Sequence, residues 1–559
     1  MLYKVYINDG NYSQWVVHDA TNMNPVDVPI NPLEKKILTG DTIDEDFKII
    51  HSPIREDKNI PGILLLLGKT YGRAKQGLGK FYYKCIPNDR RLPAFLVPYE
   101  QKVLGFNKNI TNKYILFRYI DWDAKHPNGI ITNTIGDVTN LSNFYEYQLY
   151  CKNLFHSLKS FTKETQRVYK LNAGRSFIND IMNKYPNIED RTNNEIITID
   201  PASSTDLDDA VGLKDNVLSI YIANVPLLME YFKLWESFSE RISTIYLPDR
   251  KYPMLPSLLS DNLCSLLENE ARFAFCIDIC IEEGKLKSIS YKNTVIKVKK
   301  NFRYDDKTLQ TNAMYCEIVD LIKILNKVRP YVKEIQDSHD VIAYVMILMN
   351  SECANILESY KSGIYRTLSL KETSTVEDAS ISNEVLNFIK IWQSSSGQYS
   401  NYNNKSGHAL IGKGIENYVH ITSPIRRLVD LLNIMNIQHL LKFCPLSQSA
   451  IDFYNKWEER LEYINTTMRA IRKVQVDCNV LNLCVSTPDI LNKTYDGYVF
   501  DKLERSDKFI QYMVYIPSIK ILTRVNIIED LKEYSNHKFR LYLIEDGTTL
   551  KRKIRAMME

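Results

Sequence analysis

The sequence predicts a multidomain α/β protein in which small β-barrels flank a mixed α/β region. A chain of 559 residues is long enough for three to five domains, each with a core of its own. Its beginning and its end contain short apolar segments separated by turn residues, which is typical of small barrels. The middle of the chain combines strands with long helical segments, which favours an α/β domain.

The first 140 residues favour two successive barrels. Residues 1–75 contain short β-segments at Leu2–Ile7, Trp15–His18, Ile37–Asp44 and Gly62–Leu67. Residues 76–140 continue with Lys80–Ile86, Ala94–Val97 and Lys113–Tyr119.

Cations and aromatic rings alternate near the second predicted barrel: Arg73, Lys75, Lys80, Lys84, Arg90 and Arg91, with Tyr71, Phe81, Tyr82 and Tyr83. Rings that stack on bases beside cations that bind phosphates are what a barrel for single-stranded nucleic acid needs. The same pattern also arises when the rings face a core and the cations keep the surface soluble.

From residue 141 the pattern becomes helical. Residues 141–190 predict a helical linker with helices at Asn143–Phe161 and Gly174–Lys184. Residues 191–484 predict the α/β domain, with a strand at Tyr221–Val225 and helices at Cys316–Gln336, Val341–Ser359, Asn383–Ser395, Leu428–Phe443 and Ala450–Leu483. Residues 485–559 return to β-segments and favour a third small barrel.

The most informative stretch is acidic: Thr198-Ile-Asp-Pro-Ala-Ser-Ser-Thr-Asp-Leu-Asp-Asp-Ala210. It predicts a strand end, a loop and a returning strand, with Asp200, Asp206, Asp208 and Asp209 inside ten residues. Four neighbouring carboxylates raise one another's pKa unless a cation compensates, and Mg²⁺ prefers such oxygen ligands. A solvated acidic turn would explain the same residues. An EF-hand is excluded, because its glycine and closing glutamate are missing.

Composition excludes several classes of protein. The net charge of +4 is too small to indicate a nucleic-acid partner by itself, so evidence for one must come from individual segments of the chain. The ten cysteines are scattered singly, which indicates neither disulfides nor a zinc site and favours a reducing, cytoplasmic location. The sequence begins without a secretory signal, and no uninterrupted apolar run approaches the length of a membrane span, so we expect no membrane partner. Abundant Tyr, Ile, Asn and Lys favour AT-rich coding and a large DNA virus as source.

Several separated stretches resemble, in order, the ribonuclease II/R (RNB) family and in particular its eukaryotic, exosome-type branch. Thr198–Ala210 resembles the family's acidic signature, and Thr422-Ser-Pro-Ile-Arg-Arg427 with Asp430 resembles its late signature. Three further stretches, Tyr246-Leu-Pro, Pro253-Met-Leu-Pro256 and Leu263-Cys-Ser-Leu266, resemble the central block of the family's nuclease domain. Leu38-Thr-Gly-Asp41 and His126-Pro-Asn-Gly129 resemble phrases of the two cold-shock barrels that precede the nuclease domain.

This resemblance implies both a fold and an activity. The fold comprises two OB-like cold-shock barrels (1–75 and 76–140), a helical linker (141–190), an α/β RNB catalytic domain (191–484) and an S1-like OB barrel (485–559). The activity is hydrolytic, processive 3′-to-5′ degradation of single-stranded RNA to 5′-nucleoside monophosphates.

The resemblance also implies roles for individual residues. Asp200, Asp206, Asp208 and Asp209 would hold one or two Mg²⁺ ions, with Mn²⁺ as a substitute. Asp208 and Arg426 would be catalytic, and Tyr246, Tyr304 and Arg427 would bind RNA. Structural roles compete with these: Ser423 and Pro424 fit a helix start, and in a chain with 36 tyrosines Tyr246 and Tyr304 also fit core or surface positions.

The sequence departs from the family pattern at a few places. Tyr221-Ile-Ala-Asn-Val225 stands where the family has His-Ile-Ala-Asp-Val, and Ala343-Tyr344 replaces an acidic pair that helps bacterial members read the ribose. The preference for RNA over DNA is therefore open, and a DNA nuclease is one rival hypothesis. A catalytically inactive, RNB-type RNA-binding regulator is the other.

The chain opens directly into the first predicted barrel, so the resemblance implies that the eukaryotic endonuclease domain and its exosome attachment are absent. Exosome-like partners therefore stay open, and we expect a monomer that binds single-stranded RNA.

Overall fold

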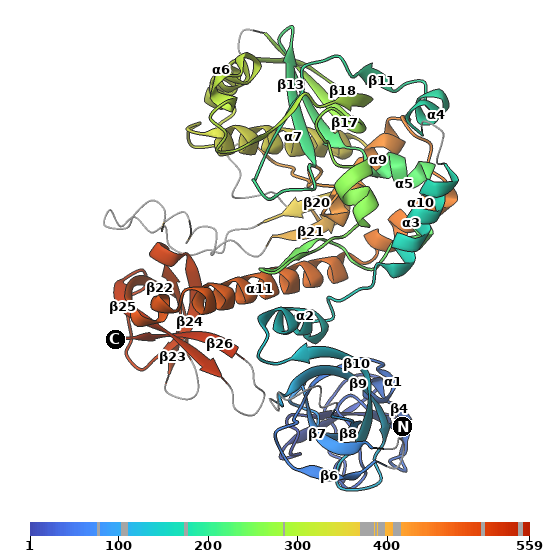
Figure 1. Ribbon diagram of the computed structural model, residues 1–559, viewed down its shortest axis with the longest axis vertical. Helices are drawn as coiled ribbons and strands as arrows, with labels where there is room; N and C mark the ends of the chain where they lie inside the picture. The colour runs from blue at the N-terminus through green and yellow to red at the C-terminus, as the bar shows by residue number, and fades with distance from the viewer. Residues whose placement is uncertain are drawn as a thin grey trace. The chain divides into compact units, whose positions relative to one another are not determined.

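The computed structural model describes the chain in two compact units (Figure 1). One unit comprises Met1–Phe155, Leu247–Asp249 and Val474–Glu559, and the other comprises His156–Tyr246 and Arg250–Lys473. The described residues are 1–74, 79–101, 110–172, 177–282, 285–368, 385, 388, 397–405, 415–504, 509–545 and 552–559. Most of the predicted helix Asn383–Ser395 lies outside them, as does Lys75.

The first sheet of the first unit is antiparallel and has the strand order β2-β1-β3-β4. Its strands are β1 (Tyr3–Ile7), β2 (Trp15–Asp19), β3 (Thr42–Ile43) and β4 (Ile49–His51). The predicted strand Ile37–Asp44 is wrong except at Thr42 and Ile43. The preceding residues form a turn in which Gly40 has a φ of 87°, and the buried Asp41 carboxylate accepts hydrogen bonds from the Leu38 amide and from Arg55.

The second sheet has the order β5-β9-β10-β8-β7-β6, and an additional pairing of β5 with β7 brings its two ends together. The short helix α1 (Pro53–Glu56) precedes it, and its strands are β5 (Ile60–Leu64), β6 (Thr70–Arg73), β7 (Phe81–Pro87), β8 (Phe95–Tyr99), β9 (Lys113–Asp121) and β10 (Asn128–Asp137). The predicted boundary at residue 75 therefore cuts through this sheet. The boundary was misplaced because hydrophobic alternation identifies strands but does not say which strands pair.

The C-terminal part of the first unit is a five-stranded antiparallel sheet in the order β24-β23-β22-β25-β26. Its strands are β22 (Thr494–Glu504), β23 (Ile510–Ile516), β24 (Ile521–Ile527), β25 (Asn536–Glu545) and β26 (Arg552–Met558). The β-character predicted for residues 485–559 is therefore present, and its assignment as an S1-like barrel stays a prediction.

The second unit is built on a mixed seven-stranded sheet in the order β11-β18-β17-β14-β13-β12-β19. Its strands are β11 (Glu189–Arg191), β12 (Ile197–Asp200), β13 (Asp209–Lys214), β14 (Val217–Ala223), β17 (Ala271–Glu282), β18 (Lys285–Lys297) and β19 (Lys300–Arg303). Two two-stranded sheets accompany it, a hairpin of β15 (Ile245–Tyr246) with β16 (Lys251–Tyr252) and an antiparallel pair of β20 (Ile364–Thr367) with β21 (Gln398–Asn401).

Helices pack against this sheet and form a continuous core with it (Figure 1). In that core, Ile220 and Ile277 of the sheet lie with Ile318, Leu348 and Ile434 of three helices. The described α-helices after α1 are α2 (Leu141–Cys151), α3 (Lys159–Leu171), α4 (Phe177–Lys184), α5 (Val225–Tyr231), α6 (Ala313–Val328), α7 (Ser338–Ser359), α9 (Leu428–Leu440), α10 (Gln448–Glu458) and α11 (Leu461–Ser486).

Three predicted helices were too long. The helix predicted at Cys316–Gln336 ends at Val328, because Arg329 precedes a proline and is disfavoured in helical geometry. The segment Asn143–Phe161 divides between α2 and α3, with Asn153 in left-handed geometry between them at a φ of 54°. Ala450–Leu483 divides into α10 and α11.

Helix α7 is, among the described helices, long and apolar enough to cross a membrane by length and composition. Continuous apolar runs did not identify it, because polar residues interrupt its sequence. Of its most apolar stretch, 67% is buried inside the protein, which is typical of a core helix.

An ion pair is buried between two strands of the seven-stranded sheet. Arg191 of β11 donates hydrogen bonds from Nη1 and Nη2 to the two carboxylate oxygens of Asp278 on β17, at 2.7 and 2.6 Å. The side chains are only 7% and 10% exposed. Burial by itself raises the pKa of Asp278, but the hydrogen bonds from Arg191 and Ser219 outweigh it and lower that pKa to about 2.

We predict that Asp278→Asn destabilises the protein by about 3–5 kcal/mol at pH 7, because it leaves a buried guanidinium without its main counter-ion. The pKa of Asp278 is lower in the folded than in the unfolded chain, so its stabilisation is present above about pH 4 and is lost as the pH falls toward 2. Scanning calorimetry across this range measures the effect. Glu282→Gln, which breaks the exposed Lys287 pair on the same strand, should change stability by less than about 1 kcal/mol. Equal losses for both variants would contradict the assignment.

Candidate active site

The acidic stretch lies where two neighbouring strands of the seven-stranded sheet meet. Asp200 is the last residue of β12 and Asp209 the first of β13, and these strands pair antiparallel through Ile197 and Val211. The antiparallel pairing brings the end of one strand beside the start of the other. The predicted strand, loop and return are therefore confirmed.

The loop between the two strands is fixed to the segment Leu263–Leu266. The Ser265 hydroxyl donates a hydrogen bond to the Thr205 carbonyl at 3.0 Å and accepts one from the Leu207 amide at 3.1 Å. The Leu266 amide donates to the Leu207 carbonyl at 3.0 Å. These bonds hold the loop that contains Asp206 and Asp208 in one conformation.

Asp208 is almost fully buried, with 2% of its side chain exposed. Its Oδ1 accepts a hydrogen bond from the Ile425 amide at 2.9 Å, and its Oδ2 accepts one from Arg426 Nε at 3.0 Å. The acidic stretch and the late signature, more than 200 residues apart in the sequence, are thus joined directly.

Asp206 lies under the hairpin of β15 and β16. The Tyr246 hydroxyl donates to Asp206 Oδ2 at 2.8 Å, and Lys251 Nζ lies 3.3 Å from Asp206 Oδ1. Lys251 also donates to Asp261 Oδ1 at 2.8 Å and to the Thr205 hydroxyl. Both oxygens of Asp206 are therefore in contact with hydrogen-bond donors.

Asp200 has a buried carboxylate oxygen, Oδ2, for which the described residues supply no hydrogen-bond partner. Its backbone carbonyl accepts a hydrogen bond from the Tyr304 amide at 3.2 Å. An unpaired buried carboxylate oxygen is costly unless a cation or a proton satisfies it.

The pKa values of three of the aspartates are raised. Burial raises the pKa of Asp200 to about 6 and that of Asp208 to about 7, and the positive charge of Arg426 opposes the shift in both. Burial, together with the charges of Asp200 and Asp208, raises the pKa of Asp209 well above its ordinary value. Arg426 therefore offsets only part of the cost of ionising these buried carboxyl groups.

The late signature forms a turn and not the start of a helix. The Arg427 amide donates to the Ser423 carbonyl at 2.9 Å, and α9 begins only at Leu428. The Ser423 amide donates to Asp430 in the first turn of α9, so Ser423 is not the N-cap that the alternative interpretation required. The turn aims the Ile425 amide and the Arg426 side chain at Asp208.

The two arginines of this turn differ in exposure. Arg426 also donates from Nη2 to the Ser423 hydroxyl at 3.0 Å, and 43% of its side chain remains exposed. Arg427 is held by Asp430 at 2.7 Å, and its Nε is buried without a partner among the described residues. Arg426 therefore faces the solvent above the acidic cluster, whereas Arg427 lies deeper.

The two predicted RNA-binding tyrosines have different surroundings. Tyr246 is 39% exposed, while its hydroxyl donates to Asp206. The ring of Tyr304 stacks on that of His339 at a centroid distance of 3.7 Å. Burial and the charges of Asp209 and Asp200 raise the pKa of Tyr304 to about 12, so its hydroxyl is neutral at physiological pH.

The donor types fit a divalent cation, but the side chains are not arranged around one. No three His, Cys, Asp or Glu side chains of the described residues converge at metal-binding distances. Asp206 and Asp208 are turned toward Lys251 and Arg426, whereas Asp200 keeps an unpaired oxygen. A hard cation that prefers oxygen ligands matches this set of donors.

Sequence reasoning missed four residues of the site: Ser265, which holds the loop, Lys251 and Asp261 beside Asp206, and His339 beneath Tyr304. Two short β-segments separated by the four residues Leu247–Arg250, which include Pro248-Asp249, are a hairpin signal that could have placed Tyr246 opposite Lys251. For His339, which lies on α7, the sequence offers no such signal.

The departures from the family pattern have structural explanations. Asn224 accepts a hydrogen bond from the Leu227 amide at 3.2 Å and caps α5, and Tyr221 is buried beside Arg191. Tyr344 is fully buried in α7, and its neighbour Ala343 is exposed.

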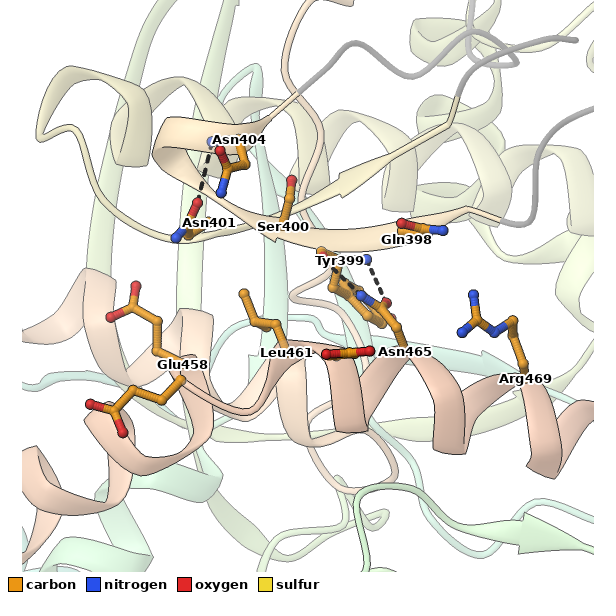
Figure 2. Close-up of a pocket in the computed structure, with 11 residues that line it drawn as sticks. Gln398, Tyr399, Ser400, Asn401, Asn404, Glu458, Leu461, Asn465 and Arg469 are labelled. Carbon is orange, nitrogen blue, oxygen red and sulfur yellow. Dashed lines mark hydrogen bonds between the residues drawn. The ribbon is translucent and has the colours of Figure 1, made fainter. Parts of the chain in front are cut away.

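A separate polar pocket of about 530 Å³ lies between β21 and the junction of α10 and α11 (Figure 2). The Asn465 side chain closes it on one side through hydrogen bonds with the backbone of Tyr399 at 2.7 and 2.9 Å. No predicted site residue lines this pocket, so the candidate active site is defined by the acidic cluster.

Comparison with protein-family models matches the RNB domain over residues 188–314 and the Dis3-like cold-shock domain 2 (CSD2) over residues 82–146. The first match contains all four aspartates, Tyr246 and Tyr304, and the two arginines lie beyond it.

Relatives are similar over parts of their length. Ribonuclease R of Helicobacter pylori is 25% identical over 444 residues, which are 67% of this chain and 66% of that protein. Exoribonuclease 2 of Yersinia pestis is 40% identical over 126 residues, 21% of this chain and 20% of that protein. The probable exosome complex exonuclease RRP44 of Caenorhabditis elegans is 26% identical over 228 residues, 39% of this chain and 23% of that protein. The chain thus spans less than two thirds of these relatives.

Solved structures share the fold. The apo form of Mycoplasma genitalium RNase R has a TM-score of 0.67 at 17% identity and covers 99% of this chain and 100% of that chain. Yeast Ssd1, described as a pseudonuclease, has a TM-score of 0.59 at 13% identity and covers 94% of this chain and 79% of its own. Parts of the chain therefore match the RNB domain and a Dis3-like cold-shock domain, and the chain has an RNase R-like fold and is similar to ribonuclease R, RRP44 and exoribonuclease 2.

Proposed function

We propose that the protein is a magnesium-dependent 3′-to-5′ exoribonuclease that processively hydrolyses single-stranded RNA to 5′-nucleoside monophosphates. The observation that supports this most strongly is the contact of Arg426 with Asp208 inside a cluster of four aspartates. In this arrangement the carboxylates could bind a metal ion, and the exposed guanidinium of Arg426 could bind a phosphate.

The four aspartates are the proposed metal ligands. Asp200 supplies an unpaired oxygen, and burial raises the pKa values of Asp200, Asp208 and Asp209, a cost of ionisation that a nearby divalent cation would offset. A magnesium ion there would lower the pKa of a water molecule and offset charge on the scissile phosphate. Mn²⁺, which also accepts oxygen ligands, is the expected substitute.

Arg426 is the proposed phosphate ligand. Nε and Nη2 are occupied by Asp208 and Ser423, which fixes the plane of the guanidinium, while 43% of the side chain stays exposed. Remaining N–H groups can donate to phosphate oxygens as negative charge builds during hydrolysis. Asp208 is thus proposed both to bind metal and to orient Arg426.

The tyrosines and Arg427 are proposed to hold RNA. The exposed ring of Tyr246 and the Tyr304–His339 stack offer flat surfaces to bases or sugars. Structures of Mycoplasma genitalium RNase R, whose fold is similar, contain ribose-methylated single-stranded RNA or double-stranded RNA. Several stacking and phosphate contacts that survive each one-nucleotide step would make degradation processive.

A catalytically inactive RNA-binding regulator is the second candidate, because the fold is shared with the yeast pseudonuclease Ssd1. The presence of all four aspartates and Arg426 favours the enzyme over this alternative. Activity on RNA separates the two candidates directly.

We expect a 5′-labelled single-stranded RNA to shorten progressively from its 3′ end in the presence of Mg²⁺, and Asp208→Asn or EDTA to abolish this. Denaturing gels over a time course give the measurement, with a DNA oligonucleotide of the same sequence as a test of sugar preference. Asp215→Asn, in the exposed turn between β13 and β14, is the matched control and should retain full activity. RNA binding without shortening by the unmutated protein would establish the regulator instead.

We also expect Arg426→Lys to reduce the rate of hydrolysis by about 10²–10³-fold, because lysine keeps the charge but loses the planar fork held by Asp208 and Ser423. Single-turnover rates separate this loss from weaker RNA binding. Arg167→Lys, on the exposed side of α3, serves as control. A rate within about threefold of the unmutated protein would remove Arg426 from the proposed chemistry.

Metal-free stability gives a further test. The raised pKa of Asp209 means that the folded chain holds a proton that the unfolded chain releases, so this residue costs more stability as the pH rises above about 4. We expect Asp209→Asn in EDTA to melt about 2–4 °C higher than the unmutated protein at pH 8, with no difference near pH 4. Added Mg²⁺ should stabilise only the unmutated protein. A variant that melts lower in EDTA would contradict the raised pKa of Asp209.

A further inference from the structure

The hairpin of β15 and β16 places two side chains on a single aspartate. Tyr246 and Lys251 are direct cross-strand partners, so their side chains project from the same side of the hairpin. We propose that they form a latch on Asp206 that competes with the divalent cation, and that RNA stacking on Tyr246 opens it. This inference rests on the metal site of the proposed function.

The latch occupies the whole Asp206 carboxylate. Tyr246 donates to Oδ2 at 2.8 Å, and the Lys251 ammonium lies 3.3 Å from Oδ1, with only 8% of the Asp206 side chain exposed. Each carboxylate oxygen keeps a second lone pair, but the positive charge of Lys251 beside Oδ1 repels a cation, and the Tyr246 hydroxyl takes one lone pair of Oδ2, so the two contacts weaken metal coordination. This engagement explains in part why no three of the described acidic side chains converge on one point.

Lys251 has a second carboxylate to which it can turn. Its ammonium already lies 2.8 Å from Oδ1 of Asp261, on the short π-helix Leu258–Leu263, and it also contacts the Thr205 hydroxyl. When a metal ion takes Asp206, Lys251 keeps an ionic partner and is not left as an unpaired charge. The latch can therefore open at low cost.

Tyr246 connects the latch to RNA. Tyr246 is 39% exposed, and within the described part of the chain its hydroxyl donates to Asp206. A base that stacks on the ring and shifts it withdraws the hydroxyl from Asp206, which then becomes available to metal. Because binding linkage is reciprocal, RNA raises the affinity for metal by the factor by which metal raises the affinity for RNA.

The amount by which the latch weakens cation binding can be estimated from the single positive charge of Lys251, which lies a few ångströms from the proposed metal ligands. Loss of the Lys251 ammonium is expected to tighten cation binding on the order of tenfold, between the limits for bulk water and for a protein surface. Loss of the Tyr246 hydroxyl removes a neutral hydrogen bond only, so we expect a smaller gain of roughly threefold.

The test is a titration of the full chain with Mn²⁺, in which the electron paramagnetic resonance signal of free Mn²⁺ reports binding without RNA and without activity. We expect Lys251→Met to bind Mn²⁺ about tenfold more tightly and Lys251→Arg, which keeps the charge, to match the unmutated protein. Lys287→Met, which removes an exposed lysine paired with Glu282, is the control and should leave the affinity unchanged.

The coupling is measured by repeating the titration with a 2′-O-methylated RNA oligonucleotide. RNA should tighten Mn²⁺ binding in the unmutated protein, and this gain should shrink in Tyr246→Phe, which keeps the ring and lacks the hydroxyl.

Two results distinguish failure of the latch proposal from failure of the proposed metal site. Unchanged or weaker Mn²⁺ binding by Lys251→Met overturns the latch, provided that an Asp200→Asn/Asp209→Asn double variant has lost binding. If the double variant binds Mn²⁺ like the unmutated protein, the acidic cluster is not the metal site, and the proposed function itself fails.

Discussion

The contact between Asp208 and Arg426 is the interaction on which the rest of the site depends. It joins a loop of the seven-stranded sheet to the turn that precedes α9, and a carboxylate with 2% exposure requires such a partner. The same turn supplies the Ile425 amide to the other oxygen of Asp208. Two donors from one turn therefore fix both the position and the orientation of this carboxylate.

A second connection runs through the backbone. The Thr244 amide and the Ser243 hydroxyl each lie 3.0 Å from the Arg426 carbonyl, and the Leu428 amide donates to the Ile242 carbonyl. This short pairing continues into β15, which positions Tyr246 over Asp206. Hydrogen bonds thus connect the proposed phosphate ligand Arg426 both with the metal ligand Asp208 and, through β15, with the base contact Tyr246.

Burial of the acidic cluster costs stability in the absence of a cation. Burial raises the pKa values of Asp200, Asp208 and Asp209, and Arg426 compensates only part of their charge. Strained electrostatics of this kind are found at functional sites, whereas purely structural ion pairs such as Arg191 with Asp278 are balanced. Lys251 resembles the groups of a functional site more than those of a structural ion pair, because its ammonium lies between two carboxylates, Asp206 and Asp261.

The sequence by itself determined the β-rich ends, the mixed centre and the chemical identity of the acidic and late signatures. Local patterns were sufficient there, because strand alternation and clustered carboxylates are visible within a few residues. Local patterns failed where the structure of a segment depends on a partner far away in the sequence. They did not assign β5 to the sheet in which it pairs with β9. They also did not predict the turn at Ser423, which is held by Asp430 and by the distant Asp208.

Only the tertiary structure decided which charges meet. Lys251 is an ordinary hairpin residue in the sequence, and it became part of the site because the hairpin folds over Asp206. His339 likewise joined the site when α7 packed beside Tyr304. The electrostatics of a buried cluster depend on distances between segments far apart in the chain, and the sequence order of those segments does not contain these distances.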